Sequence, residues 1–126
     1  MTRHRIGDGH GPEFRVAARD ALDVLAGRPG FLDGYVARAV DDAGLWTVVT
    51  VWRDVGSYRR ALSGYEAKMR VVPLLSTAVD EPSAFEVLDT RDAAGATAGG
   101  SALAADAGRT RLGHAAAPVV RTDLDS

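Results

Sequence analysis

Residues 45–58, LWTVVTVWRDVGSY, decide the fold of this chain. The first half is an unbroken run of apolar and β-branched residues, which is typical of a strand covered on both faces. The run stops at Arg53, and Asp54 is a favoured N-cap residue ahead of a pattern with helical period. We therefore predict a buried strand that ends at Trp52 and passes directly into a helix.

Side chains alternate between the two faces of a strand, so both tryptophans of this stretch share one face. That face carries Trp46, Val48, Thr50 and Trp52, and the opposite face carries Leu45, Thr47, Val49 and Val51. The second face is nearly as apolar as the first, so both need a cover. We expect helices of the same chain to cover the tryptophan face and a second copy of the chain to cover the other.

Length and composition limit the class of protein. The 126 residues are 46% apolar and 25% charged, which suits one soluble domain with a hydrophobic core. A net charge of −2 gives no general attraction to nucleic acid or to an anionic membrane. The absence of cysteine excludes disulfides and thiolate chemistry, and the three histidines are too dispersed for a metal motif. With neither a membrane span nor a secretory signal in the pattern, we expect a cytoplasmic protein without metal or cofactor.

The flanking sequence predicts further elements on either side of this strand. They are a brief strand over residues 2–6, a helix over 12–26, a strand over 31–40, a helix from 54, a second helical piece over 66–78 and a last strand over 84–88. Gly34 marks a bulge or a close approach of two elements. Pro73 predicts a break in the second helical piece, whose residues Met69, Val72 and Leu75 are expected to point inward.

The order strand, helix, strand, strand, helix, strand is the split βαβ or ferredoxin-like arrangement, an α+β fold with an antiparallel sheet. A second copy packed on the open sheet face about a two-fold axis would complete a dimeric α/β barrel, so we predict a homodimer. Residues 89–126 contain 16 alanines and glycines among 38 residues and no aromatic residue. We therefore predict one domain over residues 1–88 and a disordered tail over 89–126.

Several segments resemble the antibiotic biosynthesis monooxygenase family. They are LAGRPGFLDG at the end of the first helix, the turn DDAGLW, the strand TVVTVW with RDVGSYRRAL, and the closing VPLLSTAVDEPSAFEVL. The resemblance covers residues 3–88 and implies small dimeric α/β barrels, some of which are cofactor-free oxygenases that convert aromatic phenols to quinones, while others degrade haem. The first strand is short for the family, which suggests that the printed start lies inside it.

The predicted pocket lies between the sheet and the helices. We expect Trp52, Tyr58 and Tyr65 to form its catalytic part, with Trp46, Val48, Leu62 and Met69 contacting the substrate. Trp52 offers a ring face for stacking, although a packed core tryptophan is an equal alternative. The two tyrosines, seven residues apart on one helical face, would bond either the substrate or the backbone.

The resemblance implies a histidine in the helix after the tryptophan in catalytic and haem-binding members. This chain has Tyr58-Arg59-Arg60-Ala61-Leu62 there, so haem degradation is not expected. His4, on the first strand, would face the pocket or the sheet partner and is a weak candidate for a general base. We expect His10 and His114 to be solvated.

Two hypotheses about function follow. The first is a cofactor-independent monooxygenase that oxidises a phenolic or polyketide-like aromatic substrate with dioxygen. An electron-rich phenolate reacts with dioxygen itself, so the protein has to bind it, exclude water and favour the anion. The alternative is a non-catalytic dimeric module that binds a small molecule. In both cases the expected partners are a second copy and a small aromatic molecule.

Overall fold

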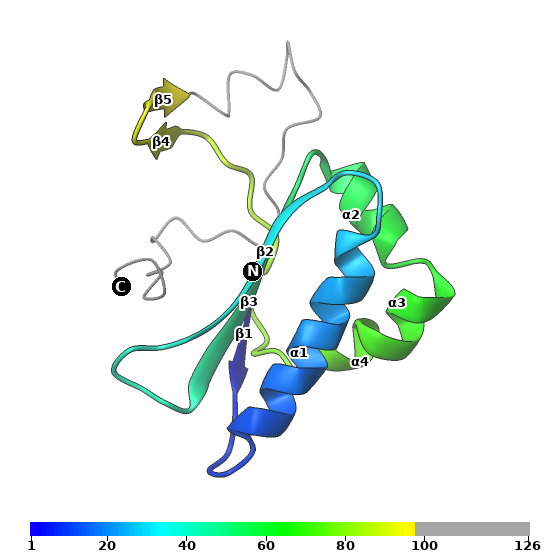
Figure 1. The fold of residues 1–126 in the computed structure, drawn as a ribbon, viewed down its shortest axis with the longest axis vertical. Helices are drawn as coiled ribbons and strands as arrows, with labels where there is room; N and C mark the ends of the chain where they lie inside the picture. Colours follow the sequence, from blue (N-terminus) through cyan, green and yellow to red (C-terminus); the bar gives the residue numbers. More distant parts are fainter. Residues whose placement is uncertain (98–126) are drawn as a thin grey trace.

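The computed structural model describes residues 1–97, which form a small α+β fold (Figure 1). The main antiparallel sheet contains β1 (Thr2–Arg5), β2 (Phe31–Arg38) and β3 (Leu45–Trp52) in the order β1-β3-β2. The helices are α1 (Gly11–Ala26), α2 (Val55–Ala61), α3 (Tyr65–Arg70) and α4 (Val72–Leu75), and a separate hairpin contains β4 (Thr90–Asp92) and β5 (Gly95–Thr97). The α+β class and the antiparallel ferredoxin-like arrangement predicted from the sequence are confirmed. No helix within residues 1–97 is long and apolar enough to cross a membrane.

β3 is the central strand because it pairs with a neighbour on each side. Val48 lies opposite Thr2 of β1 and opposite Val36 of β2. All residues of β3 from Val48 to Trp52 are buried, as the apolar run predicts.

The junction between β3 and α2 also forms as the sequence predicts. Oδ1 of Asp54 accepts a hydrogen bond from the backbone N–H of Ser57 at 2.7 Å, which caps α2. The start of β2 lies against this first turn: a Cβ added at Gly30, where φ is +90°, would come within 2.3 Å of the Ser57 hydroxyl oxygen. Glycine is therefore required at position 30 both by the backbone angle and by the packing.

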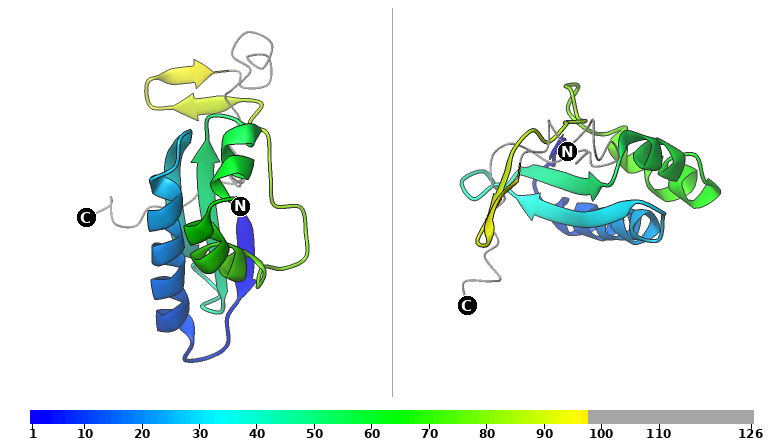
Figure 2. Two further views of the ribbon diagram at one scale, coloured as in Figure 1. Left: turned by 90° about the vertical axis from the view of Figure 1, so that its right-hand side faces the viewer. Right: turned by 90° about the horizontal axis from the view of Figure 1, so that it is seen from above.

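The hydrophobic core fills the space between the helices and the tryptophan face of β3. It contains Phe14, Ala18, Ala21 and Leu25 of α1, Trp46, Val48 and Trp52 of β3, and Ala61, Ala67, Val71 and Leu74 of the α2–α4 region. α1 lies beside α3 and α4 over this face (Figures 1 and 2). Val49 and Val51, on the other face, lie outside this cluster and are nevertheless 0% and 2% exposed in the single chain.

β2 is shorter than predicted. It ends at Arg38, and Val40, which was expected in the strand, is 84% exposed. The shift of register lies between Phe31 and Asp33. Gly34 is a point of close approach, which is one of the two roles predicted for it, because a Cβ there would lie 2.9 Å from atoms of Leu22 and Phe31.

The second helical region corrects two predictions. α2 ends at Ala61, and a turn separates it from α3, so Tyr58 and Tyr65 do not share the face of one helix. Ala67, Val71 and Leu74 are buried in this region, and Leu75 packs against the core as predicted, whereas Met69 and Val72 are 58% and 42% exposed. Ala67 has a small side chain, which lets α3 approach α1 closely. The buried stripe therefore consists of Ala67 and the residues four and seven positions after it, Val71 and Leu74.

The predicted strand over residues 84–88 does not form. The N–H of Val79 donates to the carbonyl of Arg3 at 2.7 Å, and the α-amino group of Met1 donates to the carbonyl of Ser83. These two contacts hold residues 79–83 against β1, and residues 82–89 have no regular secondary structure.

The C-terminal part of the described chain forms the β4–β5 hairpin, which stands apart from the main sheet in Figures 1 and 2. The hairpin occupies the first residues of the predicted disordered tail, so regular structure continues beyond the predicted domain boundary at 88. The rest of that tail lies outside the described residues.

Candidate functional site

Trp52, the centre of the predicted site, lies in the closed core. Its side chain is 0% exposed. Its ring packs edge-on against Phe31 at 5.3 Å and at a tilt of 54° against Tyr58 at 5.7 Å, both measured between ring centroids. The indole N–H donates to the hydroxyl of Thr50 at 2.8 Å. Both the ring and the N–H of Trp52 are thus occupied within the chain, and stacking on a substrate stays a prediction that requires the ring to be uncovered.

A small closed cavity of about 20 Å³ lies next to this cluster. It is lined by Met1, Thr2, Leu25, Val48, Thr50, Tyr58 and Leu75. Two predicted site residues, Val48 and Tyr58, meet here, and burial raises the pKa of the Tyr58 hydroxyl, which is therefore neutral at physiological pH. The volume suits one water molecule and is far below the roughly 300 Å³ at which ligand pockets begin.

The other predicted site residues are not gathered around this cavity. Trp46 is 7% exposed, its indole N–H donates to the carbonyl of Ala43 at 3.2 Å, and the guanidinium of Arg38 lies 5.4 Å from its ring centroid. Leu62 is half-buried against the core. Tyr65 is 74% exposed at the start of α3, so it does not line a pocket with Trp52.

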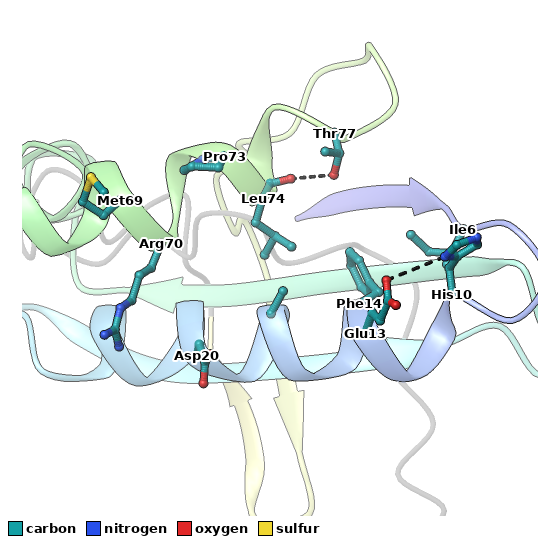
Figure 3. Close-up of a pocket in the computed structure, with 11 residues that line it drawn as sticks. Ile6, His10, Glu13, Phe14, Asp20, Met69, Arg70, Pro73, Leu74 and Thr77 are labelled. Atoms are coloured by element: carbon teal, nitrogen blue, oxygen red, sulfur yellow. Dashed lines mark hydrogen bonds and ion pairs between the residues drawn. The ribbon is translucent and has the colours of Figure 1, made fainter.

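An open groove of about 720 Å³ lies between α1 and the α3–α4 pair (Figure 3). It is lined by Ile6, His10, Glu13, Phe14, Ala17, Asp20, Met69, Arg70, Pro73, Leu74 and Thr77. Phe14 from α1 and Leu74 from α4 point into the space between the helices (Figure 3). The volume is typical of a small-molecule site, and Met69 is the predicted substrate-contact residue that the groove contains.

Polar side chains stand along the rim of this groove. Nδ1 of His10 lies 3.7 Å from Oε2 of Glu13, and Arg70 extends from α3 toward α1 (Figure 3) while its Nε lies 3.2 Å from Oε2 of Glu66. The sequence analysis placed His10 in solvent and did not single out the other rim residues, because polar residues beside an apolar stripe have the pattern of a solvated helix face. Within residues 1–97, no group of three or more histidine or carboxylate side chains is placed to hold a metal ion.

His4 lies directly behind the groove. Its side chain is 0% exposed and faces the helices, with its ring centroid 4.9 Å from that of Phe14. Nδ1 lies 3.0 Å from the hydroxyl oxygen of Thr77, and Nε2 lies 2.8 Å from that of Thr2. Burial lowers the pKa of His4 below its ordinary value of 6.5, so the buried imidazole is neutral at physiological pH.

Comparison with known proteins identifies the family to which this chain belongs. A family model described as antibiotic biosynthesis monooxygenase matches residues 1–68, which is more than half of the 126 residues. The chain belongs to the antibiotic biosynthesis monooxygenase family. The match includes β1, α1, the β2–β3 hairpin and α2, and it ends within α3.

Two solved structures share the fold of this antibiotic biosynthesis monooxygenase family member. A conserved protein from Methanosarcina mazei Go1 is 20% identical, with a TM-score of 0.54 over 64% of this chain and 79% of that one. SnoaB, a cofactor-independent oxygenase from Streptomyces nogalater, is 24% identical, with a TM-score of 0.55 over 64% of this chain and 81% of its own. No curated protein matches the chain. At these identities the two structures establish the fold.

Proposed function

We propose that this protein is a cofactor-independent monooxygenase that oxidises a planar phenolic substrate with dioxygen, and that the substrate binds in the groove between α1 and α3–α4. The observation that carries the proposal is the size and lining of the groove. It offers about 720 Å³ with Phe14 and Leu74 facing inward, whereas the cavity beside Tyr58 has about 20 Å³. The family and the description of SnoaB as an oxygenase support the reaction type.

The reaction requires the protein to bind the substrate and to remove a proton from it. An anthrone-like substrate has a ring carbonyl and, across the same ring, a CH₂ carbon. Removal of one C–H proton from this carbon leaves an aromatic phenolate, in which the carbonyl oxygen carries the charge and the former CH₂ carbon is electron-rich. Dioxygen then accepts four electrons from that carbon: one oxygen atom becomes the new carbonyl group and the other leaves as water. The substrate supplies all four electrons, so the protein has to hold the anion and keep bulk water away from it.

His10 is the base that we assign to the deprotonation. Its imidazole lines the groove, and the carboxylate of Glu13 lies 3.7 Å from Nδ1, where it can orient the ring. Arg70, which lines the same groove, is the cation available to the phenolate, and a ligand would compete for it with Glu66 at 3.2 Å.

A second candidate function is a non-catalytic module that binds the same class of molecule. The observation in its favour is the inner site, where Trp52 is 0% exposed and α2 carries Tyr58 and Arg59 but no histidine. For either function we propose a homodimer formed through the face of β3 that carries Val49 and Val51, opposite the helices.

Oxygen consumption with an anthrone probe tests the proposal, with the spontaneous rate subtracted. We expect the full-length protein to form quinone in air and none under anaerobic conditions. His10→Gln should lower kcat/KM roughly 100-fold, the scale of a lost general base. Arg19→Gln is the matched control, because Arg19 is exposed on α1 outside the groove and should leave the rate unchanged. Binding of the probe without consumption of oxygen would instead establish the binding module.

A further inference from the structure

The hydroxyl of Thr77 fixes the proton position on His4. A hydroxyl has one hydrogen to donate and two lone pairs to accept. Thr77 donates its hydrogen to the carbonyl of Leu74 at 2.7 Å, so its contact of 3.0 Å with Nδ1 of His4 requires the ring to donate. Nε2 of His4 then carries the lone pair and accepts from the hydroxyl of Thr2 at 2.8 Å. The network thus assigns the Nδ1–H tautomer of neutral His4.

The bonds to Leu74 and His4 leave the oxygen of Thr77 with one unused lone pair, because no third hydrogen-bond partner for it lies within residues 1–97. Thr77 lines the groove. We propose that Thr77, whose hydrogen is donated to the carbonyl of Leu74 and whose first lone pair accepts from His4, selects ligands that present an O–H group, so that the groove takes a free phenol in preference to its ether. Thr77 would contact the ligand and His4 would be a positioning residue. The inference rests on the groove being the ligand site proposed above.

The position of His4 explains why Thr77 keeps this role. The His4 ring is 0% exposed, packs against Phe14 and is bonded at both nitrogens, so a flip of the ring would break two buried hydrogen bonds at once. Phe14 touches His4 from the groove side and lines the groove itself. Phe14 and Thr77 both contact His4. A ligand could pack an aromatic ring against Phe14 and donate a hydroxyl hydrogen to Thr77 at the same time.

Binding of 2-naphthol and of its methyl ether, 2-methoxynaphthalene, tests the selection by isothermal titration. The two probes share the ring system, and the ether lacks the O–H donor. We expect the full-length protein to bind 2-naphthol roughly threefold to tenfold more tightly, the scale of one net hydrogen bond. Thr77→Ser keeps a hydroxyl and should keep the preference, whereas Thr77→Val should reduce the ratio of the two affinities to about one. A preference that survives in Thr77→Val would overturn the proposal.

Nitrogen-15 NMR of histidine-labelled protein tests the role of His4 without any ligand. We expect a protonated Nδ1 and an unprotonated Nε2 for His4, and a protonated Nε2 would overturn the assignment. His4→Asn, whose amide can still donate to Thr77, should retain the full preference for naphthol. His4→Leu removes one of the two bonds that fix the Thr77 hydroxyl and leaves the bond to Leu74, so it should reduce the preference without abolishing it. If neither naphthalene binds, both this inference and the proposed groove site fail. If the selection is observed and no oxygen is consumed, the inference stands and only the oxygenase proposal fails.

Discussion

At the residue scale, the buried polar groups are matched by partners that lie two residues away along the same strand. Trp52 donates to Thr50 on β3, and His4 bonds Thr2 on β1. Residues i and i+2 of a strand point to the same face, so each pair enters the core together. This alternation is why the face carrying both tryptophans was predictable from the sequence, whereas the complete burial of Trp52 depends on Phe31 and Tyr58, which come from other elements.

The substitution Trp52→Phe separates a core role from a ligand-binding role for this side chain. The smaller ring would leave a void and an unpaired Thr50 hydroxyl, so we expect a loss of about 1–3 kcal/mol in the free energy of unfolding, seen as a melting temperature lower by several degrees. Affinity for 2-naphthol should change little, because Trp52 does not line the groove.

Met69→Ala is the matched control for Trp52→Phe. Met69 lines the groove and is 58% exposed, so its truncation should weaken naphthol binding with little change in melting temperature. The opposite pattern, in which Trp52→Phe weakens binding more than Met69→Ala and hardly alters the melt, would place the ligand at the inner cavity, as the sequence analysis predicted.

At the element scale, the start of α2 depends on a single carboxylate. The hydrogen bond from the N–H of Ser57 is the main reason that the pKa of Asp54 lies below its ordinary value of 3.8, and Arg53 and Arg60 add to the effect. Because the pKa is lowered in the folded state, the stabilisation is complete above 3.8 and is lost as the pH falls through the folded-state pKa.

We therefore expect Asp54→Ala to lower the free energy of unfolding by about 0.5–2 kcal/mol at pH 7, the usual effect of a lost N-cap. The difference from wild type should shrink when both proteins are melted at a pH below the folded-state pKa of Asp54, where the carboxylate of the wild type is protonated. Asp54→Asn keeps a side-chain oxygen that can cap the helix, so it should lose less. If the free energy of unfolding of Asp54→Ala differs from that of wild type by the same amount at both pH values, the charge of Asp54 is irrelevant to the cap.

Elements with a strong local pattern were predicted well, and those that depend on distant neighbours were not. The spacing of apolar residues was enough to predict β3 and α1, and the N-cap preference of aspartate was enough to predict the cap at Asp54. The strand over 84–88 was wrong because contact with β1 is made by residues 79–83 instead, which the local pattern did not indicate. The groove was missed because its walls, α1 and α3–α4, are distant in sequence and meet only in the folded chain.

At the scale of the whole molecule, the open question is what covers the second face of β3. Val49 and Val51 were expected to need a second copy, yet they are 0% and 2% exposed in the single chain. They are not part of the cluster beneath the helices, so the helical layer does not bury them. These two side chains are therefore already covered within the single chain, and the proposed partner copy would pack over that cover. A dimer and a monomer closed by its own chain predict different behaviour in solution.

The substitution Val49→Asp decides between them when self-association and stability are measured together. We expect the wild type to sediment as a dimer and Val49→Asp to become a less stable monomer, because a charge without a partner in a dry interface costs several kcal/mol. Val16→Asp is the control, since Val16 is 53% exposed on α1 and should tolerate the same charge. A chain ending at Asp89 should remain a dimer with an unchanged melting temperature. A monomeric wild type that melts several degrees lower after this shortening would mean that residues beyond Asp89 cover the face and that the proposed dimer is wrong.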